Sequence, residues 1–138
     1  MIEITDKPIS PESLINKVKT DSSGCVVTYV GLIRQYSRGK RAISVEYEDS
    51  QRTAEGVLKQ IADEASQKWP LENLAITHRL GRLKVGDINL VVAIAAAHRG
   101  EGLAACQYVI DQFKERLPTR KKETCTDGST WVEGPGVD

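Results

Sequence analysis

Apolar residues recur at helical spacing in three stretches of the chain. Pro11 follows Ser10, as at a helix start, because serine caps free N–H groups and proline is tolerated in the first helical turn. A second pattern begins near residue 52 and ends at Pro70. The third stripe, with steps of three and four residues, consists of Leu103, Cys106, Ile110, Phe113 and Leu117. We therefore predict three helices, the last of them ended by Pro118.

Alternating or continuous apolar runs between these helices predict β-strands. The expected strands cover residues 2–4, 25–33, 43–48, 74–80 and 88–97. The last run is apolar almost throughout, so we expect a central strand covered on both faces. The 25–33 run is expected to be mostly buried, and Gly31 within it indicates a bulge or a close backbone approach. Residues 35–40 and 81–87 are expected as a loop and a turn-bearing connection, and the chain after Thr119 as a polar tail.

The order of these elements, with strands at hairpin spacing, favours an α+β fold with an antiparallel or mixed sheet over a doubly wound sheet. A length of 138 residues fits a single domain spanning 1–138. The chain has no apolar run of about 18 residues and no signal-peptide pattern, so we expect no membrane span and a cytoplasmic location. The cysteines lack metal-site spacing, so no metal is expected.

Positive charge is concentrated locally in a chain whose 19 basic and 19 acidic residues give no net charge. The cations crowd residues 34–41 and 114–122. Local patches on a neutral protein suit a small anionic ligand better than a nucleic acid, which usually requires a strongly basic domain. We therefore expect no nucleic-acid partner.

Several cations are candidates for an anion site. His98 and Arg99 end the central apolar run and open a glycine-flanked turn before the third helix, where free N–H groups favour anions. A glycine-rich connection whose polar residues merely face water fits this turn equally well. Lys114 falls in the last turn of the helix, where a cation also offsets the helix dipole. Lys121 lies beyond Pro118, so helical geometry does not place it, and Arg34 ends a strand; each is open to reading as a solvated charge.

His78 alternates with apolar residues along the expected strand at 74–80. This position favours a hydrogen-bonded core or interface histidine over a catalytic one.

Four ordered segments resemble the large, catalytic subunit of molybdopterin synthase. The first is residues 24–34, and the second is residues 45–48 with a helix ending at Trp69-Pro70. The third is His78-Arg79-Leu80-Gly81 with Gly86-Asp87 and the strand ending at His98-Arg99. The fourth is the helix bearing Lys114 with Lys121-Lys122-Glu123 and Trp131-Val132-Glu133. The match runs from about residue 24 to 133 and leaves a short tail at 134–138. Its order and spacing make the resemblance specific.

The resemblance implies an α/β-hammerhead fold and a homodimer at the core of a heterotetramer. Each chain would bind a small ubiquitin-like sulfur carrier, whose C-terminal Gly-Gly thiocarboxylate enters the active site. The implied reaction transfers two sulfurs to cyclic pyranopterin monophosphate and makes the dithiolene of molybdopterin, with no metal or other cofactor needed for that step.

The same resemblance identifies Lys114 and Lys121 as the expected catalytic residues. The expected substrate-binding residues are Leu32, Ile33, Arg34, His98, Arg99, Lys114, Lys121, Lys122 and Glu123. His98 and Arg99 are expected to serve the neighbouring subunit's pocket as well. Two anionic reactants require a cationic pocket, and a lysine whose pKa is lowered by burial and nearby cations can carry the proton transfers.

Two features depart from the family pattern. Thr119-Arg120 replaces an apolar-Trp pair before the lysines, and the tail after Glu133 is short. The alternative is therefore a weakly active or inactive paralogue that only docks a ubiquitin-like sulfur carrier.

Overall fold

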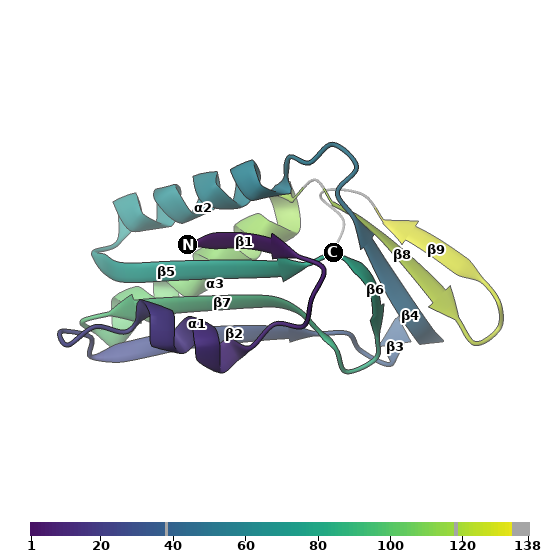
Figure 1. Ribbon diagram of the computed structural model, residues 1–138, viewed down its shortest axis with the longest axis horizontal. Helices are drawn as coiled ribbons and strands as arrows, with labels where there is room; N and C mark the ends of the chain where they lie inside the picture. The colour runs from purple at the N-terminus through teal and green to yellow at the C-terminus, as the bar shows by residue number, and fades with distance from the viewer. Residues whose placement is uncertain (38, 118, 134–138) are drawn as a thin grey trace.

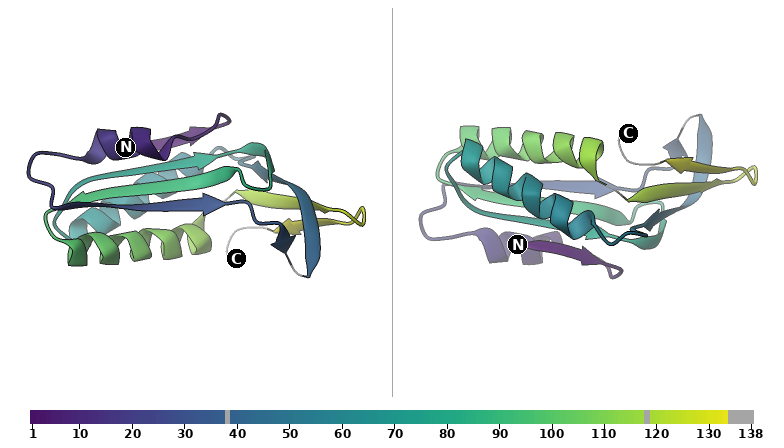
Figure 2. Two further views of the ribbon diagram at one scale, coloured as in Figure 1. Left: turned by 90° about the horizontal axis from the view of Figure 1, so that it is seen from below. Right: turned by 90° about the horizontal axis from the view of Figure 1, so that it is seen from above.

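A four-stranded sheet with helices on both faces forms the larger part of the fold (Figure 1). The computed structural model describes residues 1–37, 39–117 and 119–133. The elements of this part are β1 Ile2–Thr5, α1 Pro11–Val18, β2 Cys25–Leu32, α2 Ala54–Lys68, β5 Leu71–Arg79, β7 Ile88–Ala96 and α3 Arg99–Arg116. The strand order is β1-β5-β7-β2, with β1 parallel to β5 and the other pairs antiparallel. In the views along the sheet, α1 covers one face and α2 and α3 cover the other (Figure 2).

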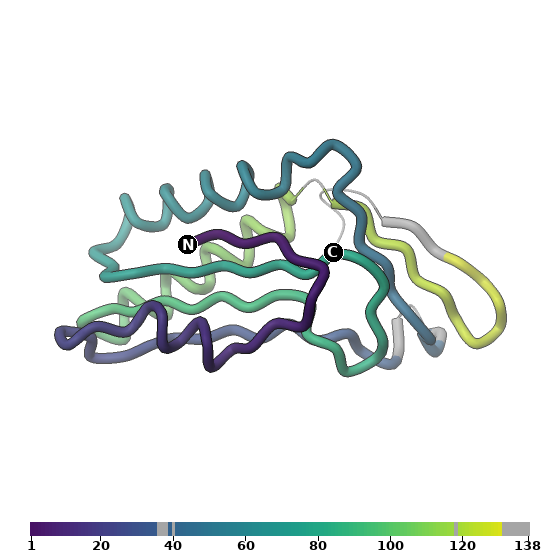
Figure 3. Tube along the Cα trace, in the orientation of Figure 1, coloured from purple at the N-terminus to yellow at the C-terminus, as the bar shows by residue number. Residues whose placement is uncertain are grey.

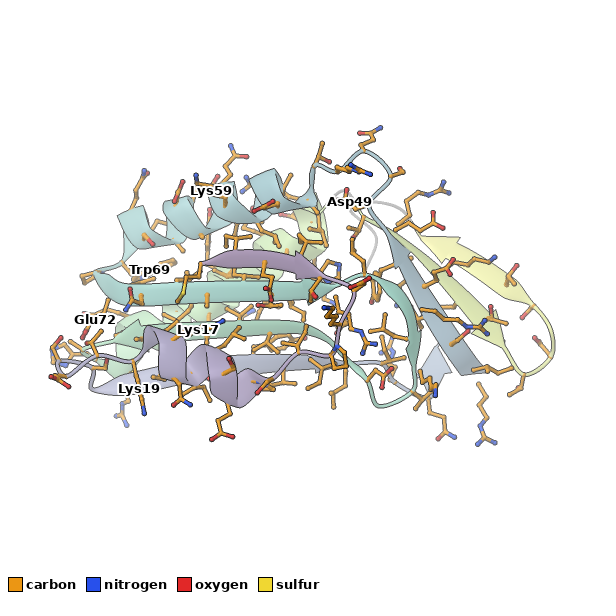
Figure 4. The ribbon with its side chains drawn as sticks, in the orientation of Figure 1. Lys17, Lys19, Asp49, Lys59, Trp69 and Glu72 are labelled. Carbon is orange, nitrogen blue, oxygen red and sulfur yellow. The ribbon has the colours of Figure 1, made fainter. Side chains whose placement is uncertain are left out.

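The expected three helices, the mixed and antiparallel sheets and the α+β class are confirmed for the described part of the chain. The Ser10 side chain accepts a hydrogen bond of 3.2 Å from the Ser13 N–H, as expected for an N-cap. The second helix starts slightly later than its apolar pattern. Asp49, labelled in Figure 4, accepts hydrogen bonds from the N–H groups of Thr53 and Ala54, at 3.1 and 3.2 Å.

The central strand β7 carries a different kind of side chain on each face. Leu90, Val92 and Ile94 pack with α2 and α3, whereas Val91, Ala93 and Ala95 pack with α1. All of them are buried, which confirms that this strand is covered on both sides. The alanines let the short helix α1 lie close to the sheet, while the larger residues fill the space under two helices.

A second sheet stands beside the first and completes the fold (Figures 1 and 3). Its strands are β3 Tyr36–Ser37, β4 Lys40–Glu48, β6 Gly81–Lys84, β8 Arg120–Cys125 and β9 Thr130–Glu133. β4 pairs with β8 along one edge and with β3 and β6 along the other. The expected loop at 35–40, the connection at 81–87 and the polar tail were therefore partly wrong, because each contains a strand. The tight turn at Gly86, with φ of 91°, is confirmed.

Strand β8 was not predicted from the pattern of apolar residues, because polar residues occupy its covered face. Glu123 is 3 % exposed and Cys125 4 % exposed, whereas Arg120 and Lys122 lie on the exposed face. Charged residues on one face of β8 alternate with charged residues on the other, so the sequence there shows no alternation of apolar and polar positions.

Three expectations about packing were also wrong. The β2 strand is half-buried rather than mostly buried, because it is the last strand of its sheet in the described chain. Ile43 was expected to share one face of its strand with Val45 and Tyr47. It is instead 49 % exposed, because a register shift between Ala42 and Ser44 turns it to the open face. Leu103 is 56 % exposed, and smaller residues such as Gly102 and Ala105 meet the sheet instead. A Cβ at Gly102 would already lie 3.0 Å from Val27, so this end of α3 packs too closely for leucine.

None of the described helices is long and apolar enough to cross a membrane. Pro118 and the tail at 134–138 lie outside the described residues, but α3 ends at Arg116, just before that proline.

Candidate active site

A cavity of about 270 Å³ opens where the two sheets and the end of α3 meet. It is lined by Tyr29, Gly31, Leu32, Ile33, Arg34, Val45, Tyr47, Asn89, Leu90, Phe113, Lys114, Lys121 and Glu123. We call it the cationic cavity, because its lining includes three cations, Arg34, Lys114 and Lys121, and a single carboxylate, that of Glu123. The sequence separates these residues widely, and the fold brings them together.

Lys114 and Lys121 reach the cavity from different layers of the molecule. Lys114 is an exposed residue of the last turn of α3, whereas Lys121 is a half-buried residue of β8 in the second sheet. The two lysines, which flank Pro118 in the sequence, therefore line one pocket.

Lys121 forms an ion pair with Glu123 inside the cavity. Its Nζ lies 2.9 Å from Glu123 Oε1, and the glutamate side chain is 4 % exposed. Residues two apart on a strand point to the same face, which is why the pair forms within β8. Opposite charges at this distance attract each other, so the pair holds the Lys121 ammonium inside the cavity.

Lys122 lies on the opposite face of β8 from the cationic cavity. It lines a separate surface depression with Ser44, Glu46, Arg82 and Thr124. Arg120 occupies the same outer face and has Glu48 as its cross-strand neighbour. The replacement of the family's usual residue by Arg120 therefore changes the outside of the sheet rather than the lining of the cavity.

The segment after β2 supplies another wall of the cavity. A register shift lies between Gly31 and Leu32, as expected from the glycine, and a Cβ at Gly31 would lie 2.7 Å from Asn89 Oδ1. Leu32 is 59 % exposed and Arg34 is also exposed, so both can meet a ligand. Ile33 is 5 % exposed and packs with Val45 and Leu83, so it serves mainly as a core residue of this wall.

His98 and Arg99 lie at the other end of α3 from the cationic cavity. They are exposed at the N-cap and the first residue of the helix. The helix between Arg99 and Lys114 spans about 22 Å at its rise of about 1.5 Å per residue. The structure therefore does not bring this pair to the cavity of its own chain.

Seven lining residues were not predicted as site residues from the sequence: Tyr29, Gly31, Val45, Tyr47, Asn89, Leu90 and Phe113. The aromatic residues lie in ordinary apolar patterns, which do not separate a pocket wall from a core. Asn89 did carry a signal, because an amide near the start of an otherwise apolar strand needs a polar partner. Its Nδ2 donates a hydrogen bond of 3.0 Å to Tyr47 Oη.

His78 lies directly behind this wall and is fully buried. Burial lowers its pKa to about 4, and the hydrogen bond to the Asn89 carbonyl only partly opposes that effect. The expectation of a hydrogen-bonded core histidine is confirmed.

The arrangement suits an anionic ligand with a planar part. Three cations at the cavity can hold anionic groups, and aromatic side chains beside them can contact a flat ring. Among the residues that the structure describes, no group of three or more His, Cys, Asp or Glu residues is placed to hold a metal ion.

Comparisons with known proteins agree with this geometry. The MoaE protein family profile matches residues 4–116. The Molybdopterin synthase catalytic subunit of Bacillus subtilis is 38 % identical over 130 residues, covering 94 % of this chain and 83 % of the relative. The crystal structure of Molybdopterin Synthase from Staphylococcus aureus superposes with a TM-score of 0.89 at 34 % identity, covering 96 % of both chains.

A more distant structure shares the fold. It is a protein-protein complex of subunits 1 and 2 of Molybdopterin-converting factor from Helicobacter pylori, with a TM-score of 0.74 at 15 % identity, covering 91 % of this chain and 86 % of that one. The family profile, the fold and the closer relatives lead to one conclusion: the chain belongs to the MoaE family of molybdopterin synthase catalytic subunits.

Proposed function

We propose that the cationic cavity transfers sulfur from the C-terminal thiocarboxylate of a small ubiquitin-like carrier to cyclic pyranopterin monophosphate, forming the dithiolene of molybdopterin. The observation that carries the proposal is the convergence of Lys114, Lys121 and Arg34 on one cavity. Both reactants are anions, and both must lie within reach of each other for sulfur to move. The cationic cavity meets that requirement, and we place the reaction in the cytoplasm.

The two lysines have separable roles in this proposal. Lys121, held by Glu123, is the acid/base beside the pterin, because its ammonium is aimed by a buried carboxylate. Lys114, at the exposed rim, anchors or activates the incoming thiocarboxylate. Arg34 binds phosphate, for which the planar guanidinium is well suited.

The carrier enters from the exposed side of the cavity. Leu32, at the rim, leaves 59 % of its surface exposed, and Lys114 beside it is also exposed. We expect an extended Gly-Gly tail to enter the cavity at this rim. The Helicobacter pylori complex pairs its two subunits in one assembly, which supports a small-subunit partner for this chain as well.

A second copy of the chain completes the site in this proposal. β2 ends the order of the first sheet, so its outer edge is free to pair within the described part of the molecule. On α3, Leu103, Gln107, Ile110 and Lys114 share the flank opposite the one that contacts Glu64 of α2. That flank therefore faces the β2 edge, with exposed Leu103 at its start.

Antiparallel pairing of two β2 strands about a twofold axis would place the two α3 helices side by side and in opposite directions. The strand spans about 26 Å and the helix about 27 Å, so the start of one helix would lie beside the end of the other. His98 and Arg99 would then reach the neighbouring subunit's cavity. In this arrangement His98 and Arg99 serve the neighbouring subunit's cavity, although they do not reach the cavity of their own chain.

Reconstitution tests the proposed reaction. The purified chain is mixed with a thiocarboxylated carrier and cyclic pyranopterin monophosphate, and molybdopterin is measured. We expect Lys121→Ala to lower the rate by about 100-fold or more, as for loss of a positioned acid/base. Lys59→Ala, on the exposed side of α2, is the matched control and should keep full activity. Full activity of Lys121→Ala would refute the assignment.

The alternative is a paralogue that docks the carrier without chemistry. Such a protein would bind the carrier in calorimetry yet convert no precursor in the same mixture. Conversion of the precursor by the wild-type chain would exclude it.

A further inference from the structure

The buried residue His78 lies between the two parts of the molecule that carry the lysines. Its ring makes edge-on contacts with Tyr47 of β4 and with Phe113 of α3, and each pair of ring centroids is 5.2 Å apart. Both contact residues line the cationic cavity. His78 itself is fully buried on β5 and is not among the lining residues.

A β-bulge supplies the hydrogen-bond partner of His78. In the pairing of β2 with β7, Gly31 faces Leu90 and Leu32 faces Ile88, so Asn89 is the extra residue. The pairing of β5 with β7 stops at His78 and Leu90. Asn89 therefore has no partner residue in either ladder, and its carbonyl oxygen lies 2.9 Å from His78 Nδ1 instead.

The same bulge fixes the Asn89 side chain. Its amide donates to Tyr47 Oη at 3.0 Å, so one residue links the end of the first sheet to β4 of the second. A continuous chain of contacts runs from the imidazole through the Asn89 backbone and side chain to Tyr47.

This network reaches a neighbour of each lysine. Phe113 directly precedes Lys114 in the last turns of α3. Tyr47 is the cross-strand partner of Lys121 in the pairing of β4 with β8. A change at His78 would therefore shift both elements that present the lysines, although His78 touches neither ammonium group in the contacts described above.

We propose that His78 is a positioning residue that sets the separation of Lys114 and Lys121 by holding Tyr47, Phe113 and the Asn89 bulge. Its low pKa, about 4 because of burial, leaves the ring neutral near pH 7, with Nδ1–H free to donate to the carbonyl. Nε2 has no hydrogen-bond partner within the described residues, so the interior tolerates a polar atom here. A phenylalanine would pack as well, and the hydrogen bond to the bulge explains why the position is not apolar.

The inference rests on the proposed sulfur transfer, and two variants separate positioning from packing. His78→Phe keeps an aromatic ring but loses the donor to Asn89. His78→Asn loses the ring but places an amide N–H near the position of Nδ1. We expect His78→Phe to lower kcat by about tenfold with little change in KM for the carrier, as for a small misplacement of reacting groups. His78→Asn should recover most of that loss, although its cavity lowers Tm further.

The matched control is Ile76→Val, which lies two residues earlier on the same face of β5 and is fully buried. It should lower Tm without changing kcat. Activity that falls only as Tm falls across all three variants would overturn the proposal, and so would His78→Asn being no better than His78→Phe.

Lysine reactivity gives a second measurement that needs no turnover. The isolated chain is briefly acetylated with acetic anhydride, and labelling of Lys114 and Lys121 is compared with that of Lys59 by mass spectrometry. We expect His78→Phe to change labelling of both cavity lysines by about twofold or more, and Ile76→Val to change neither, since reactivity follows the local environment of the amine. An inactive wild-type chain would refute the proposed function, whereas unchanged labelling in His78→Phe would refute the positioning role.

Discussion

Replacing Glu123 by glutamine removes one charge from the ion pair in the cationic cavity and changes little else. The Lys121 Nζ to Glu123 Oε1 distance of 2.9 Å corresponds to an attraction of about 6 kcal/mol at an effective dielectric constant of about 20. Most of this offsets the cost of taking the carboxylate out of water. Lys121 keeps 23 % of its side chain exposed, so water compensates part of the loss, and we expect a net cost of about 1–3 kcal/mol.

Urea unfolding measures this cost directly. For 138 residues the unfolding entropy is about 0.3 kcal/mol per degree, so the same change should lower Tm by about 3–10 °C. Glu48→Gln is the control, because Glu48 is an exposed cross-strand neighbour of Arg120 and such surface pairs contribute less than about 1 kcal/mol.

The activity of the same variant is measured in the reconstituted reaction. Glu123→Gln should lower the rate of sulfur transfer, because the ammonium of Lys121 loses the carboxylate that aims it. Unchanged stability together with an unchanged rate would show that the ion pair neither stabilises the fold nor positions Lys121.

Three further predictions follow from other contacts. Hydrogen bonds from Arg116, and to a lesser extent from Tyr108, lower the pKa of Glu64 from 4.5 to about 2. The stabilisation by ionised Glu64 is therefore present above pH 4.5 and is lost as the pH falls towards 2. Between these pH values the Tm of Glu64→Gln should fall less than that of the wild type, and an equal fall in both would contradict this. Gly24→Ala should lower the free energy of unfolding, measured in urea, by at least about 2 kcal/mol, because its Cβ would lie 2.0 Å from the Ala97 carbonyl oxygen. Gly56→Ala, in open space on α2, should instead raise it by up to about 1 kcal/mol. Leu103→Glu should shift sedimentation from dimer to monomer, while Lys59→Glu should not; an intact Leu103→Glu dimer would place the interface elsewhere.

The elements with ordinary amphipathic patterns were predictable from the sequence. Strand β7 is a continuous apolar run, the helices α1 and α2 have clear apolar periodicity, and the end of α3 follows from Pro118. Strand β8 was not predictable, because its inward residues include Lys121 and Glu123, which pair with each other instead of meeting an apolar core. The helix α3 was assigned correctly, but its buried face was not. Close packing against the sheet selects small residues there, which leaves Leu103 outside.

The sequence indicated several residues that line the cavity, but not the geometry of the cavity. Resemblance indicated Arg34, Lys114 and Lys121, and the structure gathers all three at one cavity. Neighbours in the sequence nevertheless separated in space. Lys122 lies across the strand from Lys121, and His98 and Arg99 lie a helix length from Lys114. Strand alternation and helix rise explain both separations, but only once the bounds of β8 and α3 are known.

The path of the chain between the two sheets has a mechanical consequence. The chain leaves the first sheet after β2, returns through α2, crosses again to form β6, returns to β7 and crosses once more after α3. A domain attached by one linker can swing, but a sheet tethered at so many points has little freedom to do so. The cationic cavity is then shaped before any ligand arrives, and local opening of its walls would require loss of the main sheet. Heat should therefore melt both sheets in one cooperative transition, with the calorimetric and van't Hoff enthalpies equal.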